Sequence, residues 1–442
     1  MDMTPKEIVT YLDDYIIGQN DAKKTIAIAL RNRYRRMQLT PELQEDIMPK
    51  NILMIGSTGV GKTEIARRMA KMMSLPFVKV EASKYTEVGY VGREVESMIK
   101  DLAYESYNLV TKEYEDQNQG SIDGEVIKQI VEILVPSLPE SASENAKDSF
   151  IKTYNVMEKK VLSGDMDDKK ITIALPKTTH VEIVDSNVPM DMSAISESIN
   201  NMMGKMGKEK IEKEVTIKEA KKLLRGLAAD NLLDKDALKI EAVKRCENGG
   251  IIFLDEIDKI ATGNNSKNSD PSKEGVQRDL LPIVEGSNVH TKYGQIKTDH
   301  ILFIAAGAFH VSKPSDLLPE LQGRFPLRVE LHPLDEEALY KILTNTKNSL
   351  LKQYKALLDV EEVNLEFTDD AIRSFAKLSV SANEKAEDIG ARRLHTVIEK
   401  VLEDISFDAD EHKGETITVT EELVHDKLED IAQNEDTARY IL

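Results

Sequence analysis

The chain has a single cysteine, Cys246, among its 442 residues, which excludes an internal disulfide and any zinc site built from several cysteines. We expect Cys246 to be a small buried apolar residue rather than a reactive one. No apolar run approaches the roughly 18 residues that a membrane-spanning helix needs. The first residues, MDMTPKEIVTYLDDYIIG, lack the basic and then apolar layout of a secretory signal. These absences favour a cytoplasmic protein.

Basic residues are also few relative to acidic ones, 59 against 78, which gives a formal net charge of −19. A nucleic-acid motor needs a basic stripe that neutralises phosphates, so this balance argues against that class of function. One basic cluster, RNRYRR at Arg31–Arg36, lies on a predicted helix. It has three open interpretations: a solvated helix face, a contact for a phosphate-rich ligand, or a contact for a neighbouring acidic subunit.

Apolar spacing divides the chain into an α/β part, an insertion and a helical C-terminal part. Short apolar strands alternate with helices over residues 1–109, and this alternation favours a parallel sheet that is covered on both faces. Residues 110–245 hold polar, glycine-containing stretches between helical ones and no nucleotide motif. Strand-type sequence resumes over 246–331, so 110–245 is predicted to be a largely helical inserted domain. Residues 332–442 predict a small α-rich C-terminal domain.

The segment GSTGVGKT, Gly56–Thr63, fits the pattern G-x-x-x-x-G-K-[ST] and lies between a predicted strand and a predicted helix, as a phosphate-binding loop requires. Its glycines let backbone N–H groups approach phosphates, and the helix N-terminus adds a favourable dipole. We expect Lys62 to reach the β- and γ-phosphates of ATP and the Thr63 hydroxyl to bind Mg²⁺. The predicted ATP contacts of this segment are Gly59, Val60, Gly61, Lys62, Thr63 and Glu64.

A second motif, IIFLDE at Ile251–Glu256, is an apolar strand that ends in two carboxylates. Such a strand brings Asp255 to the sheet edge near Mg²⁺, which it binds directly or through a water. Glu256 beside it can polarise the attacking water. The acidic pair therefore favours hydrolysis over transfer to an acceptor, whereas Asp258 is expected to cap the next helix.

An NTPase also needs positive charge at the γ-phosphate, and two arginines beside glycines are candidates. Arg324 lies in PELQGRFP and Arg392 lies in DIGARRLH. An arginine from the same chain or from a neighbouring one can raise the rate by orders of magnitude. By spacing alone, either side chain could equally be an ordinary surface arginine.

Taken together, the motifs resemble those of the AAA+ ATPases of the Clp type over nearly the whole chain. Four further segments carry this resemblance: IIGQ (Ile16–Gln19), GVQRDLLPIVEG (Gly275–Gly286), LPELQGRFP and GARRLH. The resemblance implies that Ile17 contacts the adenine base and that Arg392 is the sensor-2 arginine. It also implies that Arg324 is an arginine finger reaching a neighbour's ATP, with Glu320 at the same subunit boundary.

The chain departs from the family pattern at two places. Ser57 stands where relatives often have proline, which should be harmless because neither side chain is needed for phosphate contact. The segment FIAAGAFH, Phe303–His310, has no asparagine where many AAA+ proteins carry a sensor-1 residue, so none is assigned. Members of the ClpX kind would add a Cys-rich zinc module and an Ile-Gly-Phe docking loop, and the sequence has neither.

The segment GYVG, Gly89–Gly92, places a tyrosine between glycines close to the nucleotide motifs. Taken alone, it predicts a glycine-bounded turn with Tyr90 packed inward. The family resemblance implies instead a pore loop, in which Tyr90 and Val91 grip a substrate chain and Gly89 and Gly92 act as hinges.

The same resemblance implies a ring, a homohexamer, with ATP between subunits. Hydrolysis would drive unfolded protein into a separate peptidase ring of the HslV type, onto which the C-terminal YIL would dock. The chain has no GxSxG or HExxH motif, so we expect ATP hydrolysis without peptidase activity of its own. The alternative is an ATP-driven remodelling chaperone that acts without a peptidase.

Overall fold

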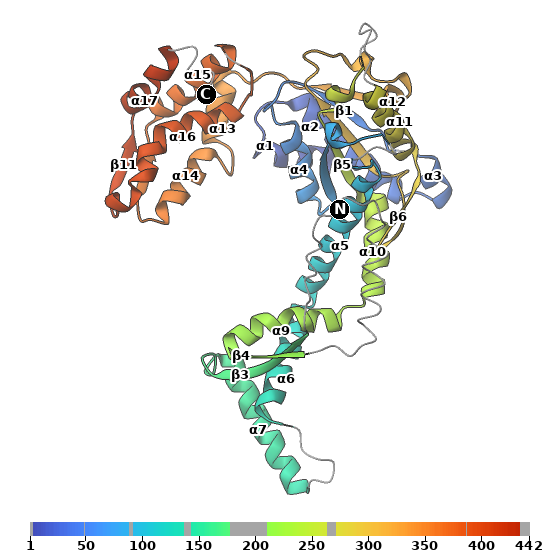
Figure 1. Cartoon of the computed structure of the whole chain (residues 1–442), viewed down its shortest axis with the longest axis vertical. Helices are drawn as coiled ribbons and strands as arrows, with labels where there is room; N and C mark the ends of the chain where they lie inside the picture. The colour runs from blue at the N-terminus through green and yellow to red at the C-terminus, as the bar shows by residue number, and fades with distance from the viewer. Residues whose placement is uncertain are drawn as a thin grey trace. The chain divides into compact units, whose positions relative to one another are not determined.

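A computed structural model describes residues 3–47, 49–87, 92–136, 143–176, 210–262, 271–385 and 387–433. The contacts between residues divide the chain into two compact units. Unit 1 comprises Met1–Val110 and Ala237–Leu442, and unit 2 comprises Thr111–Asp236 (Figure 1). The chain passes between them inside two continuous helices, α5 (Ser97–Gln117) and α10 (Lys235–Gly249).

Unit 1 is built on a five-stranded sheet with the order β2-β5-β8-β1-β9. All neighbouring strands are parallel. The strands are β1 (Ile52–Ile55), β2 (Phe77–Glu81), β5 (Ile251–Asp255), β8 (Leu302–Gly307) and β9 (Leu327–Glu330). The predicted α/β fold with a parallel sheet is confirmed. Because all of these strands run the same way, the segments that follow β1 and β5 leave the sheet at the same edge.

Each central strand supplies side chains to two cores, one on each face of the sheet. In β5, Ile252 and Leu254 enter one core while Ile251 and Phe253 enter the other. The first core is covered by α5, α10, α11 (Pro271–Glu285) and α12 (Pro319–Arg324). The second core is covered by α1 (Pro5–Asp13), α2 (Asn20–Met37) and α4 (Lys62–Met72). Burial on both faces explains why these strands read as continuous apolar runs.

Shorter elements complete this part of unit 1. They are α3 (Pro41–Asp46), the hairpin β6 (Asn288–Thr291) and β7 (Gly294–Lys297), and the 3₁₀ turns η1 (Ala82–Lys84), η2 (Ile257–Ile260) and η3 (Pro314–Asp316). Cys246 is fully buried in the first core, as expected, and burial raises the pKa of its thiol to about 12.

The basic cluster Arg31–Arg36 is not simply a solvated face. Arg33 is 8% exposed and donates hydrogen bonds to the carbonyls of Asn248 (2.9 Å), Gly250 (3.1 Å) and His300 (2.7 Å). Arg36 is also buried, and its Nε donates to the carbonyl of Gln44. The solvated-face interpretation is therefore wrong for these two side chains, and Arg33 ties the end of α10 to the starts of β5 and β8.

The C-terminal part of unit 1 has its own core, formed among its described residues by five helices and a two-stranded parallel sheet. The helices are α13 (Glu336–Thr344), α14 (Leu350–Asp359), α15 (Asp369–Lys385), α16 (Arg392–Phe407) and α17 (Glu421–Gln433). The strands are β10 (Asn364–Phe367) and β11 (Thr416–Val419), and η4 (Ala409–His412) precedes β11. The helical C-terminal domain expected from the sequence is confirmed.

The described residues of unit 2 pack three helices against an antiparallel hairpin around a separate apolar core. Its elements are α6 (Gln119–Leu134), α7 (Glu144–Ser163), β3 (Lys170–Pro176), β4 (Lys210–Thr216) and α9 (Ile217–Leu232). Thr216 and Glu219 form a capping box that starts α9 directly after β4. Among the described residues, no helix combines the length and the apolar character needed to cross a membrane.

Candidate nucleotide-binding site

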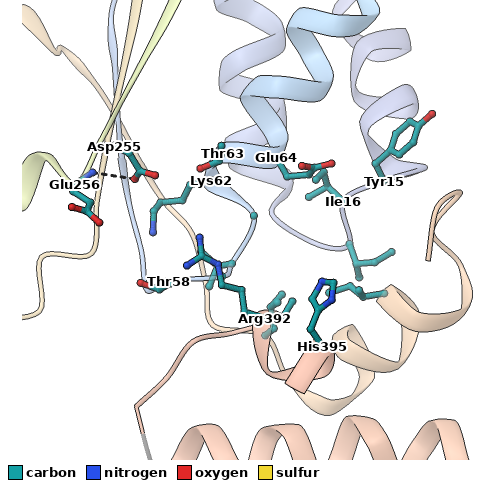
Figure 2. A pocket seen from close by; sticks show the side chains of 17 residues that line it. Tyr15, Ile16, Thr58, Lys62, Thr63, Glu64, Asp255, Glu256, Arg392 and His395 are labelled. Atoms are coloured by element: carbon teal, nitrogen blue, oxygen red, sulfur yellow. Dashed lines mark hydrogen bonds between the residues drawn. The ribbon is translucent and has the colours of Figure 1, made fainter. Parts of the chain in front are cut away.

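A cavity of about 400 Å³ lies where the two parts of unit 1 meet (Figure 2). Three segments of the α/β part and two of the C-terminal part line it. The lining residues are Tyr15, Ile16, Ile17, Thr58, Gly59, Val60, Gly61, Lys62, Thr63, Glu64, Asp255, Glu256, Leu334, Ile342, Ala391, Arg392 and His395. The cavity thus brings together Ile17, the predicted phosphate-binding loop, the carboxylate pair and Arg392, which lie far apart in the sequence.

The phosphate-binding loop joins β1 to α4 and requires glycine at two turns. Gly59 has φ +76° and Gly61 has φ +100°, a region that other residues rarely adopt. The Lys62 ammonium donates to the carbonyls of Gly56 (2.6 Å) and Ser57 (2.7 Å), so it folds back over its own loop. Burial lowers the pKa of Lys62, whereas the nearby carboxylates of Asp255 and Asp258 act to raise it.

The carboxylate pair stands at the end of β5, at the same sheet edge: Asp255 is the last residue of the strand and Glu256 follows it. Asp255 forms an ion pair with Lys79 of the neighbouring strand β2 (2.7 Å), and it accepts a hydrogen bond from the Glu256 backbone N–H (3.0 Å). Glu256 has φ +55°, a strained conformation for a residue with a side chain. Its carboxylate accepts a hydrogen bond from the Ser83 hydroxyl (3.0 Å). Such backbone strain persists only where the surrounding structure holds it, and it is common at functional sites.

Arg392 is the first residue of α16 and enters the cavity from the C-terminal part. Figure 2 shows its side chain rising toward the phosphate-binding loop, and its charge acts to lower the pKa of Lys62. The preceding turn also touches the loop directly, because the Ala391 N–H donates to the Gly59 carbonyl (3.2 Å). Two cationic side chains from different parts of the chain therefore face the same cavity.

The other end of the cavity is apolar. Ile16 and Ile17 of the N-terminal segment line it together with Leu334 and Ile342, which come from the C-terminal part. The buried Lys23 ammonium holds the segment in place by donating to the Ile16 carbonyl (3.1 Å). Apolar walls at one end and cationic groups at the other match the base and the phosphates of a nucleotide.

Gln19 connects the N-terminal segment to the start of the C-terminal part. Its amide nitrogen donates to the His332 carbonyl (2.8 Å), and its amide oxygen accepts from the His332 N–H (3.0 Å). The Gln19 side chain therefore pairs with the His332 backbone much as a neighbouring strand would.

The predicted interface residues Arg324 and Glu320 lie on α12, and neither lines the cavity of its own chain. Arg324 is 48% exposed and pairs with Glu285 at 2.8 Å. The remaining predicted site residues Gly89, Tyr90 and Val91 lie outside the described residues, as does the C-terminal YIL. Gly92 is described, and a Cβ there would lie 2.3 Å from the Thr86 hydroxyl oxygen.

Several lining residues were not predicted from the sequence. Ile16 belongs to the IIGQ segment, Thr58 to the loop motif, and Ala391 and His395 to the GARRLH segment, whereas Tyr15, Leu334 and Ile342 lie in no motif. His395 could have been found from Arg392, because residues three apart share a helix face. Leu334 and Ile342 read as ordinary core residues, since nothing in their spacing separates a cavity wall from a domain core.

Three family models match successive parts of the chain. The model described as "ATPase family associated with various cellular activities (AAA)" matches residues 52–151, and "AAA domain (Cdc48 subfamily)" matches 177–328. The model "C-terminal, D2-small domain, of ClpB protein" matches 334–409. These matches agree with an ATPase site formed by an α/β domain and a small C-terminal domain.

Curated relatives match along the whole length. The ATP-dependent protease ATPase subunit HslU of Campylobacter jejuni (strain RM1221) is 59% identical over 443 residues, with 100% of each chain covered. The same-named protein of Helicobacter pylori (strain P12) is 58% identical over 443 residues, covering 100% of this chain and 99% of the relative. The chain therefore belongs to the HslU family of AAA ATPases, the ATPase subunits of an ATP-dependent protease.

Proposed function

We propose that this ATPase is a protein unfoldase and translocase that works as a homohexamer and feeds substrates into an HslV-like peptidase ring. The observation that carries the proposal is the cavity shared by the α/β part and the C-terminal part of unit 1. A nucleotide bound there touches both parts, so its hydrolysis can change how they meet.

In this proposal the cavity binds ATP with the adenine at the apolar end, against Ile17, and with the phosphates on Gly59–Thr63. Lys62 and Arg392 neutralise the phosphate charge. Glu64 at the start of α4 is held by ion pairs with Arg67 and Arg68. The Arg68 guanidinium also stacks on the Tyr15 ring, 4.3 Å from its centroid, which braces the apolar end.

The residues present fit a bound Mg²⁺ ion. Thr63 and Asp255 supply hydroxyl and carboxylate oxygens, the donor types that this ion prefers. Within the described parts of the chain, no group of three or more His, Cys, Asp or Glu side chains could hold a metal. With Thr63 and Asp255 as its protein ligands, the ion would be bound mainly by substrate phosphates and water and would offset the phosphate charge.

Glu256 is proposed to polarise the water that attacks the γ-phosphate. Its carboxylate lies at the cavity wall, one residue beyond Asp255, and the Ser83 hydroxyl orients it. A glutamate at this place acts as a general base toward water. Water is then the acceptor of the γ-phosphoryl group, so the products are ADP and phosphate.

Two contacts, one between backbone groups and one between the Gln19 side chain and the His332 backbone, are proposed to carry the nucleotide state to the C-terminal part. One joins Ala391 to Gly59 beside the phosphates, and the other joins His332 to Gln19 beside the base. Gly59 and Ala391 line the cavity whereas Gln19 and His332 do not, so loss of the γ-phosphate changes the first contact more than the second. The C-terminal part can then rotate about the second contact.

The proposed grip on substrate is Tyr90 with Val91, between the hinges Gly89 and Gly92. Nearby, the Thr86 N–H donates to the Arg93 carbonyl (3.2 Å), and Tyr85 and Arg93 form an isolated bridge. Contacts at Tyr85, Thr86 and Arg93 therefore anchor both ends of the short segment that carries Tyr90.

Replacing Tyr90 with alanine tests the unfoldase proposal. The variant is expected to keep most of its basal ATPase activity, because the nucleotide cavity is unchanged. Degradation of a folded substrate with the peptidase should fall at least about tenfold, because the apolar grip is lost. Both rates are measured on the same preparation, with Tyr90→Phe as the control that keeps the ring. Undiminished degradation by Tyr90→Ala would remove Tyr90 from the grip.

The alternative is a remodelling chaperone that acts without a peptidase. Deleting the C-terminal tail distinguishes it from the proposed unfoldase that feeds a peptidase. Deleting Arg439–Leu442 should leave ATPase activity and substrate unfolding in place but abolish degradation, because docking onto the peptidase ring is lost. Unfolding is followed by the fluorescence of a folded reporter, and degradation by the release of peptides. If degradation survives the deletion, the tail is not the docking element.

A further inference from the structure

Asn383, near the end of α15, bonds the turn that precedes Arg392. Its amide nitrogen donates to the Gly390 carbonyl (3.1 Å), and its amide oxygen accepts from the Ile389 N–H (3.3 Å). The same oxygen accepts from Nε of Arg393 (3.2 Å). One side chain thus bonds both a carbonyl and an N–H of the turn that leads to Arg392.

Arg393 also supports the turn. It is 2% exposed, and its guanidinium donates to the Glu387 carbonyl (2.8 Å) as well as to Asn383. Successive residues of a helix point about 100° apart, so Arg392 can face the cavity while Arg393 anchors the helix start. The two adjacent arginines therefore have different tasks, which the motif alone does not distinguish.

The turn held by Asn383 packs so closely against the phosphate-binding loop that no Cβ atom fits between the two backbones at Gly59 or Gly390. Gly390 has φ +57°, and a Cβ there would lie 2.7 Å from the Thr58 carbonyl oxygen. A Cβ on Gly59 would lie 1.9 Å from the Ile389 carbonyl oxygen. Because backbone meets backbone at this point, a small displacement of the turn displaces either the loop or Arg392.

We propose that Asn383 is a positioning residue of the nucleotide site. Together with Arg393 it holds the turn at residues 387–391 as a rigid platform, which sets Arg392 in the cavity and the Ala391 N–H on the Gly59 carbonyl. This inference rests on the proposed role of Arg392 at the phosphates. Nothing in the chain's motifs assigns Asn383 to the site, since it neither lines the cavity nor lies in the GARRLH segment.

The test replaces Asn383 with alanine in the full-length protein. Affinity for a fluorescent ATP analogue should fall about fivefold to tenfold, the size expected from losing one or two hydrogen bonds that fix the turn. KM for ATP should rise by a similar factor. Hydrogen exchange at residues 387–391 should become faster, because the Ile389 N–H loses its acceptor.

Three comparisons separate positioning from a general loss of stability. Asn383→Asp keeps both acceptor contacts and should restore part of the affinity. Glu384→Ala changes the exposed neighbour on α15 and should leave affinity and KM unaltered. In the Arg392→Ala background, Asn383→Ala should cost clearly less affinity than it does alone, because Arg392 is no longer there to be positioned and only the contact of Ala391 with Gly59 remains to be held.

The outcomes also separate this inference from the proposed function. If Arg392→Ala weakens ATP binding and Asn383→Ala does not, or if the two losses multiply in the double variant, the inference alone is overturned. If Arg392→Ala itself leaves ATP affinity and turnover unchanged, the proposed role of Arg392 fails and the inference fails with it.

Discussion

Replacing Glu256 with glutamine is expected to leave ATP binding nearly unchanged and to reduce hydrolysis by at least about a hundredfold, the contribution of a positioned general base. Glutamine has nearly the same shape but cannot accept the proton of the attacking water at neutral pH. The Ser83 hydroxyl can still donate to the amide oxygen, so the side chain can keep its orientation. Binding is measured with a fluorescent ATP analogue and turnover by phosphate release.

The matched control is Glu81→Gln. Glu81 ends β2 directly beside Asp255 in the strand register, yet it does not line the cavity. Removing its charge also changes the local electrostatic field but does not touch the proposed water position. Turnover should therefore stay within about twofold of the parent, because a partly exposed charge outside the cavity is screened in part by salt. Hydrolysis at the parental rate by Glu256→Gln would mean that another group activates the water.

The strained backbone at Glu256 allows a second test, of the variant's stability. A non-glycine residue at φ +55° costs about 1–3 kcal/mol, and here the strain aims a carboxylate at the cavity wall. Gln in its place keeps the same backbone, so its stability to denaturant should match that of the parent. A parallel drop in stability would attribute the lost turnover to the fold rather than to the chemistry.

The sequence predicts those parts of the site that follow from local rules. The glycines and Lys62 of the phosphate-binding loop form a spacing that only a strand–loop–helix junction satisfies. Asp255 and Glu256 end an apolar run long enough for one buried strand. In a parallel sheet the carboxyl ends of the strands gather at one edge. In this sheet β8 alone lies between β5 and β1.

The remaining features depend on tertiary contacts that no local pattern contains. The ion pair between Lys79 and Asp255 exists because β2 pairs with β5, and the order of strands in a sheet is not written in their periodicity. The bonds between Gln19 and His332 join residues separated by most of the α/β part. For Asn383, a polar residue at the end of a helix reads as an ordinary surface position until the turn it holds is seen against the loop.

Replacing Arg324 with alanine is expected to lower ATP hydrolysis by about a thousandfold or more, the range found for an arginine that reaches the γ-phosphate from a neighbouring subunit. ATP affinity should change much less, because Arg324 does not line the cavity of its own chain. Steady-state phosphate release and analogue binding on the assembled protein measure the two effects.

The geometry of Arg324 is compatible with such a reach. Its guanidinium is about half exposed and, among the described residues, is held by Glu285. An ion pair of this kind contributes about 0–1 kcal/mol. Leaving Glu285 for a neighbour's phosphate is therefore a small cost. The control is Arg328→Ala. Arg328 is an exposed arginine on β9, four residues after Arg324, and its side chain bonds Gln322. This change should leave turnover close to that of the parent.

A mixing experiment decides whether Arg324 acts on its own chain or on the next one. Arg324→Ala subunits keep an intact Glu256, and Glu256→Gln subunits keep an intact Arg324. If the arginine acts in trans, one kind of mixed interface has every catalytic group. There the Arg324→Ala subunit supplies the cavity with Glu256, and its Glu256→Gln neighbour supplies Arg324. Mixtures should then regain hydrolysis, with a maximum at comparable amounts of the two, although each variant alone is inactive. Because a cis role leaves every cavity in the mixture defective, the absence of recovery at every ratio would contradict the trans assignment.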